Sequence, residues 1–209
     1  VVFVLFAVHE AQDVPNKLAS AKPIEWRDLR KFDKHYWRVV VLGVMFTLAR
    51  FSEAFLILKA HEGGLTLALA PLVLVVMNIV YSFGAYPAGV LADRMGPRGL
   101  LLASLAALIA ADVLLARGDG LIMIFAGISL WGVHMALSQG LLSKLVADHA
   151  PVALRGSAFG VFNLSSGVAM LLASAVAGGL WTLFGAATTF LAGAVFALLA
   201  GVLVVAMRR

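Results

Sequence analysis

The sequence predicts an all-α membrane protein with six membrane-spanning helices, and three observations support that prediction. Apolar residues make up 62% of the 209 residues and charged residues only 13%, about half of the roughly 25% found in soluble domains. Residues 156–207 form a run of 52 residues without a charge, which a soluble domain with a surface to cover does not need. The apolar runs show no period-two alternation, so membrane strands are not expected. The composition excludes a soluble enzyme, a nucleic-acid-binding protein and a disordered chain.

The six spans follow from the lengths of the apolar segments and from the residues that separate them. A crossing needs about 20 mainly apolar residues, because the hydrocarbon core is roughly 30 Å thick and a helix rises about 1.5 Å per residue. The last two spans share the uncharged run, which is too long for one crossing, and the break between them is expected at Phe184 and Gly185. Charges, glycines and prolines divide the chain into the predicted spans 38–59, 66–91, 99–117, 121–143, 157–183 and 186–207.

The spans define three regions of the chain. Residues 1–8 are wholly apolar and are interpreted as the end of a truncated transmembrane helix, residues 9–37 as a cytoplasmic central loop, and residues 38–207 as the six-helix bundle. With this order, 13 of the 16 Lys and Arg residues fall on the side of the central loop and the C-terminus. Because cytoplasmic loops carry an excess of Lys and Arg, that side is predicted to be the cytoplasm.

A charged, glycine-containing connection joins the second and third predicted spans. It reads GVLADRMGPRGLL from residue 89 to residue 101 and resembles the signature loop of the major facilitator superfamily, Gly-x-Leu-Ala-Asp-Arg-x-Gly-Arg-Lys. Glycines permit close backbone approach and a tight turn, and arginines can satisfy helix-end carbonyls or bind anionic lipid. By resemblance, this loop takes part in gating. The matching residues are Gly89, Leu91, Ala92, Asp93, Arg94, Gly96 and Arg98, whereas Pro97 replaces the usual basic residue.

The resemblance extends over nearly the whole chain. Residues 78–89 are similar to the eighth helix of bacterial members, and residues 151–163 to the start of their eleventh helix. The resemblance implies the C-terminal half of such a transporter: the end of helix six, the central loop, and helices seven to twelve as two inverted three-helix repeats. It also implies a missing N-terminal six-helix half and a substrate site near the membrane midplane between the halves.

Ionisable side chains inside a span cost about 2.5–3.5 kcal/mol each on insertion scales, so they point to function or to pairing. Arg50 and Glu53 lie three residues apart in the first span and would share one face of a continuous helix. As a functional pair they would bind a proton or a substrate. The alternative is a static ion pair.

Polar residues of the remaining spans extend this candidate pathway. Trp131, His134 and Ser138 lie on one stripe of the fourth span, where the histidine could titrate or simply satisfy a neighbouring helix. Asn78 and Tyr81 on the second span could donate hydrogen bonds to substrate or between helices.

Asp112 lies near the outer end of the third span. It is expected to reach interfacial water or Arg117, with a proton site as the alternative.

The predicted function is secondary active transport of a small solute by alternating access. The leading interpretation is a proton-coupled efflux antiporter in a bacterial inner membrane, because the spans carry few charges. A second interpretation is uptake of a small polar or anionic solute, with Arg50 as the contact of the anion. A third is a non-transporting scaffold or sensor on the same fold, and a fourth is a dimer of the half-chain.

The expected partners are the solute, protons, the lipid bilayer and the missing N-terminal half, and nucleic acid is not expected. The sequence contains no cysteine, no complete zinc motif, no phosphate-binding loop and no recognisable catalytic triad spacing. An enzyme, a cofactor and a bound metal are therefore not predicted.

Overall fold

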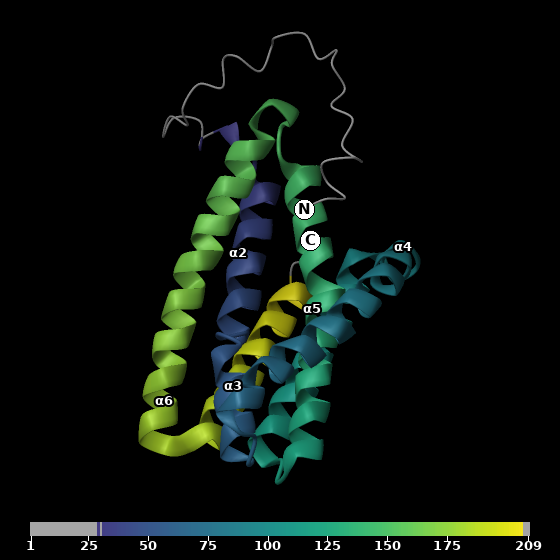
Figure 1. Cartoon of the computed structure of the whole chain (residues 1–209). Helices are drawn as coiled ribbons and strands as arrows, with labels where there is room; N and C mark the ends of the chain where they lie inside the picture. The colour runs from purple at the N-terminus through teal and green to yellow at the C-terminus, as the bar shows by residue number, and fades with distance from the viewer. Residues whose placement is uncertain (1–28, 30, 207–209) are drawn as a thin grey trace, which may run out of the picture. The chain divides into compact units, whose positions relative to one another are not determined.

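The computed structural model describes residue 29 and residues 31–206, which are helical throughout apart from short connections. Four helical stretches are long and apolar enough to cross a membrane: Lys34–Glu62, Leu67–Arg117, Leu121–His149 and Val152–Ala206. This confirms the all-α prediction for the described part of the chain (Figure 1). The segment predicted as a truncated helix, residues 1–8, and most of the predicted central loop lie outside the described residues.

The first stretch consists of two helices, α2 (Lys34–Ala49) and α3 (Ala54–Glu62). Asp33 caps α2 by accepting a hydrogen bond from the backbone N–H of Tyr36 at 2.8 Å. At the other end of α2, Arg50 has extended backbone (φ −116°, ψ 95°). A continuous helix carrying Arg50 and Glu53 on one face was therefore a wrong prediction. Residues 50–53 interrupt the first span, and we refer to them as the α2–α3 break.

Helices α4 (Ala70–Arg117) and α6 (Arg155–Ala206) each contain a glycine with non-helical backbone. Gly96 has φ 72° and Gly185 has φ 83°. Residues with a side chain rarely adopt such positive φ values, whereas glycine does so readily. Gly185 is where the sequence predicts the break in the uncharged run, and Gly96 lies in the signature loop. The ribbons of both helices double back on themselves (Figure 1). Without these turns, the 48 residues of α4 and the 52 residues of α6 would form straight helices about 72 and 78 Å long.

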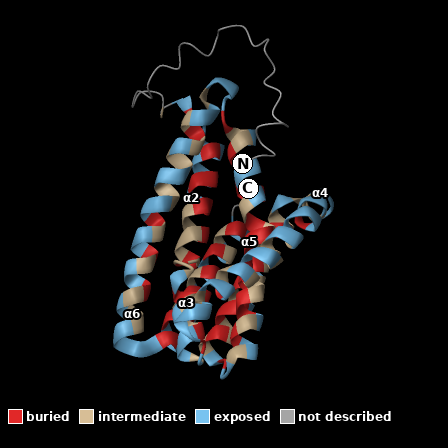
Figure 2. Cartoon of the chain, viewed as in Figure 1, coloured by how far each residue is buried: buried red, intermediate tan, exposed pale blue. Residues whose placement is uncertain are grey.

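Helix α4 packs against α5 (Leu121–His149) and α6, and α2 packs against α6. The hydroxyl of Tyr36 on α2 donates a hydrogen bond to the carbonyl oxygen of Ala158 on α6 at 2.9 Å. Buried residues face the inside of the helix assembly, and long exposed faces remain on α4 and α6 (Figure 2). Large apolar side chains lie on these faces, such as Phe83 at 80% exposed and Leu171 at 73%. Such surfaces need lipid or protein cover.

Candidate functional site

The α2–α3 break lies beside α5 and forms a polar cluster inside the helix assembly. A cavity of about 40 Å³ separates the two elements, which is close to the roughly 30 Å³ that one water occupies in the liquid. This inner cavity brings together Arg50, His134 and Ser138, three of the residues singled out from the sequence. The lining residues are Phe46, Thr47, Arg50, His134, Ser138, Gln139 and Leu142.

His134 is only 2% exposed and is held by α4. Its Nδ1 lies 3.0 Å from both the hydroxyl and the carbonyl oxygen of Ser104. The imidazole also stacks on Phe46, with ring centroids 6.1 Å apart. Because Nδ1 is engaged by Ser104, Nε2 is the ring nitrogen left for a ligand in the inner cavity.

The stripe predicted on α5 is only partly brought to the inner cavity. The hydroxyl of Ser138 donates to the carbonyl oxygen of His134 at 2.7 Å, so its proton is already used within α5. Trp131 is fully buried and packs against Phe51, with ring centroids 5.5 Å apart. Its indole Nε1 has no hydrogen-bond partner, and it does not line the inner cavity. The spacing of Trp131, His134 and Ser138 along the sequence could not predict that their side chains have different surroundings.

Arg50 and Glu53 are both half-buried at the α2–α3 break. Where both partners are described residues, acidic and basic side chains come within 4.0 Å at Asp33 and His35 and at Asp93 and Lys144, and not at Arg50 and Glu53. The static pair considered for Arg50 and Glu53 therefore does not form in this conformation.

Asn78 and Tyr81 lie on the first part of α4 and differ in their surroundings. The exposed Asn78 side chain donates from Nδ2 to the carbonyl oxygen of Leu74 on its own helix, at 2.8 Å. Tyr81 is half-buried and lines a second, larger cavity. Within the described residues, Asn78 lines neither cavity.

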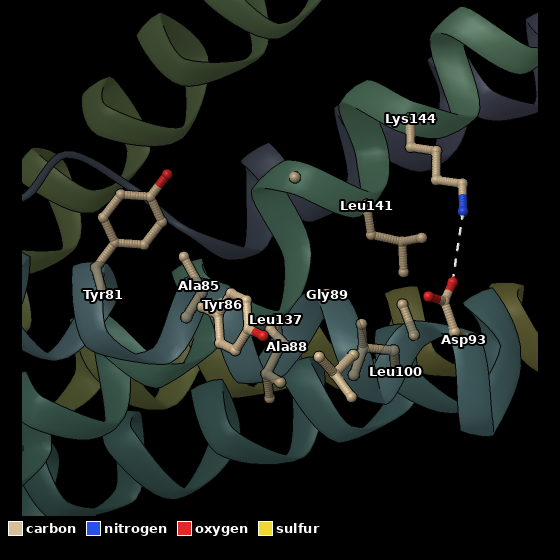
Figure 3. A pocket seen from close by; sticks show the side chains of 14 residues that line it. Tyr81, Ala85, Tyr86, Ala88, Gly89, Asp93, Leu100, Leu137, Leu141 and Lys144 are labelled. Carbon is tan, nitrogen blue, oxygen red and sulfur yellow. Dashed lines mark ion pairs between the residues drawn. The ribbon is translucent and has the colours of Figure 1, made fainter.

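The larger cavity, which we name the signature-loop groove, measures about 570 Å³ and lies between α4 and α5. Figure 3 shows Lys144 of α5 reaching toward Asp93, and their charged atoms are 3.9 Å apart. Lys144 was not among the site residues predicted from the sequence, although its place on the predicted cytoplasmic side was a signal. The groove is lined by Tyr81, Ala85, Tyr86, Ala88, Gly89, Val90, Ala92, Asp93, Leu100, Ala136, Leu137, Gly140, Leu141 and Lys144.

The remaining signature-loop residues occupy distinct places. Arg98 donates a hydrogen bond to the carbonyl oxygen of Val205 near the end of α6, as predicted for a loop arginine, whereas Arg94 is exposed. Gly96 forms the turn. A Cβ added at Gly89 would meet nothing within 4 Å, so the close approach predicted there is wrong for the described residues.

Asp112 on the second part of α4 departs most from its prediction. It is 0% exposed, and neither carboxyl oxygen has a hydrogen-bond partner. The expected contact with interfacial water or Arg117 was wrong, because α6 covers this position. Gly193 of α6 lies so close that an added Cβ would be 2.9 Å from Oδ2 of Asp112.

Metal ligation finds no support in residue 29 or residues 31–206. No group of three or more His, Cys, Asp or Glu side chains there could hold a metal ion.

Comparison with known proteins gives consistent results. Residues 39–209 match the sequence profile of the Major Facilitator Superfamily. An uncharacterized MFS-type transporter of Methanocaldococcus jannaschii is 30% identical over 186 residues, which cover 84% of this chain and 45% of the relative. The crystal structure of PepTSo, a POT family transporter, has a TM-score of 0.67 at 19% identity, covering 84% of this chain and 37% of that one.

The three comparisons support different statements. The structural likeness, at 19% identity, concerns the fold alone. The chain spans less than half the length of both relatives. The curated relative is described as an MFS-type transporter, and the family assignment rests on the profile match over residues 39–209. The profile match and the four apolar helices identify an integral, multi-pass membrane protein.

Proposed function

Because this chain belongs to the major facilitator superfamily, we propose that it is the C-terminal half of a secondary active transporter that moves a small solute by alternating access. The breaks at Gly96 and Gly185 support six crossings, since α4 and α6 are each far longer than the bilayer core of roughly 30 Å. The first three crossings and the last three then form two repeats. The remaining half of the transporter is an N-terminal six-helix unit.

The observation that carries the proposal is the α2–α3 break with its arginine. Discontinuous helices near the midplane form the substrate and ion sites of many secondary transporters, because unwound backbone leaves polar groups free to bind a ligand. Here Arg50 directly follows the last residue of α2 and lines the inner cavity with His134 and Gln139. The inner cavity, at about 40 Å³, has room for about one water, so a solute would need space from the N-terminal half or from movement of the break.

We favour proton-coupled efflux of a small amphipathic compound. The residues proposed for the pathway are Arg50, Glu53, His134 and Ser138, with Tyr81 at the entrance to the signature-loop groove. Trp131 packs behind them, and Asn78 faces outward as a hydrogen-bonding group for the N-terminal half. The membrane is proposed to be a bacterial inner membrane, with the central loop and the C-terminus in the cytoplasm.

Uptake of a small polar or anionic solute is the competing proposal, and Arg50 is the observation that favours it. A guanidinium at the edge of a cavity binds carboxylate or phosphate groups with charge-assisted hydrogen bonds.

The test is flux through the complete transporter in proteoliposomes with an imposed proton gradient. Replacing Arg50 with Ala removes a charge-assisted contact worth about 1.5–3 kcal/mol, so flux should fall roughly tenfold or more. The matched control is Arg117→Ala, which removes the same charge from an exposed helix end and should leave flux unchanged.

The direction of flux and its solute separate the candidates. Outward, proton-driven movement of hydrophobic dyes supports efflux, and inward movement of an anion supports uptake. Unchanged flux in Arg50→Ala would remove Arg50 from the site. No flux of any solute in the complete protein would favour the scaffold or sensor, and crosslinking in membranes would reveal a dimer of the half-chain.

A further inference from the structure

Asp112 is a buried carboxyl group that the proposed substrate pathway does not use. It lies on the second part of α4 and is completely buried, with no hydrogen-bond partner at either oxygen. A carboxylate in such a place would lose its hydration without gaining a donor, at a cost large enough that buried acids neutralise instead. The geometry points to Asp112 as an occluded proton-binding site whose protonated form keeps the α2–α3 break packed against α4 and α6.

The packing around Asp112 explains the link to the break. An added Cβ at Gly193 would lie 2.9 Å from Oδ2 of Asp112, 3.0 Å from the ring of Phe51 and 3.4 Å from the carbonyl oxygen of Ala49. Gly193 therefore lets three elements meet: α4, α6 and the end of α2. Ala49 is the last residue of α2, and the carbonyls at a helix C-terminus carry partial negative charge.

The charges around Asp112 leave a proton as the ligand that fits. The elements around Asp112 carry Arg50 and Glu53 at the break, His134 on α5 and Arg117 on α4, and α6 has no titratable residue from 156 to 206. In the described part of the chain, none of them forms an ion pair or hydrogen bond with Asp112. The close contacts at Gly193 also leave no space for a hydrated metal ion.

Protonation of Asp112 then holds the α2–α3 break in its packed position, and we call this effect the latch. A proton from water binds one carboxyl oxygen of Asp112 and later returns to water, and no other bond forms or breaks. The ionised form needs water or a donor, which it reaches only if the α2–α3 break or α6 moves away. Asp112 would thereby take part in the proton coupling described under the proposed function. The test of its protonation needs neither substrate nor flux, so the role of Asp112 and the transport function can fail separately.

Infrared spectroscopy of the 209-residue chain tests the protonation state directly. At pH 7, a protonated carboxyl C=O band should be present in the wild-type protein and absent from Asp112→Asn. The control Asp119→Asn changes the same group in an exposed connection and should keep the band. Asp112→Ala provides the same test if the asparagine variant does not fold. The proposal is overturned if the band is missing from the wild-type protein or persists in the Asp112 variants.

A thiol at the break tests the latch. The chain contains no cysteine, so Ser52→Cys gives a single reporter of similar size at a half-buried position. Its labelling by a water-soluble maleimide is compared with that of the same cysteine in an Asp112→Asn background, which corrects for ionisation of the thiol itself. With Asp112 present, the corrected rate should rise by up to about tenfold per pH unit as the carboxyl ionises. Equal pH dependence in both backgrounds would contradict the latch.

Discussion

The inner cavity at the α2–α3 break and the signature-loop groove both lie against α5, but they have opposite characters. The inner cavity is small and lined by buried polar groups, with His134 only 2% exposed. The groove is more than ten times larger, at about 570 Å³ against about 40 Å³, and its ion pair joins two exposed side chains. Buried polar contacts are costly to break and exposed ones are not. The signature-loop groove therefore offers the larger volume, and the inner cavity offers the buried, specific polar contacts.

The largest expected effect on stability comes from Gly132, where α5 packs closely against α4. A Cβ on Gly132 of α5 would lie 2.6 Å from the carbonyl oxygen of Met77 on α4, and backbone must move to accept it. Gly132→Ala should therefore lower the free energy of unfolding by about 2–3 kcal/mol, measured by denaturation in detergent micelles. The matched control is Gly140→Ala in the groove, where a Cβ meets nothing. It should be neutral or stabilising by up to about 1 kcal/mol. Similar losses in both variants would remove the contrast between the two regions.

The second effect tests the hydrogen bonding of the inner cavity. His134→Leu keeps much of the apolar volume but leaves the hydroxyl and carbonyl of Ser104 without the imidazole, which contacts both at 3.0 Å. Leaving such groups unpaired costs about 1–3 kcal/mol, so the variant should unfold earlier than the wild-type protein. Adding Ser104→Ala should recover part of the loss. No recovery in the double variant would show that packing against Phe46, and not the hydrogen bond, is what His134 contributes.

A smaller effect is expected in the groove. Asp93 and Lys144 are 77% and 59% exposed and their charges are 3.9 Å apart, so the pair should contribute below about 1 kcal/mol. Lys144→Ala should change the free energy of unfolding by no more than that, and added salt should erase the change. A loss comparable to that of His134→Leu would mean that the groove is more tightly coupled to the fold than its exposure indicates.

Much of the fold could be predicted from the sequence, because its main signals are local. Apolar length indicates the helices, and the turns at Gly96 and Gly185 use a residue that tolerates positive φ. The α2–α3 break carries no glycine or proline, and its one clear local signal is Ser52, whose hydroxyl accepts a hydrogen bond from the Ala54 N–H at 3.3 Å. It depends on distant contacts such as the hydrogen bond from the Ser52 N–H to the hydroxyl of Ser174, 3.3 Å long and 122 residues away.

The candidate site could be predicted only in part for the same reason. His134 and Ser138 reach the inner cavity as their spacing indicates, but Trp131 on the same stripe does not. The burial of Asp112 depends on Gly193, which lies in another helix far along the chain. A one-dimensional pattern places a polar residue on a face, and the packing of neighbouring helices decides whether that face meets water, lipid or protein.

The smallest expected effect concerns Asp33, an exposed carboxylate with a well-formed partner. The hydrogen bond from the backbone N–H of Tyr36 lowers the pKa of Asp33 below its ordinary value of 3.8. A carboxylate whose pKa is lower in the folded state stabilises the fold above its unfolded pKa, and that contribution is lost as the pH falls through the folded value. The wild-type melting temperature should therefore exceed that of Asp33→Ala slightly at pH 7, and the difference should shrink at more acidic pH. Asp119→Ala is the matched control, because its carboxylate is exposed and forms no ion pair with another described residue, so it should change the melting temperature at pH 7 less than Asp33→Ala does. A gap between the wild-type protein and Asp33→Ala that widened on acidification would contradict the capping role.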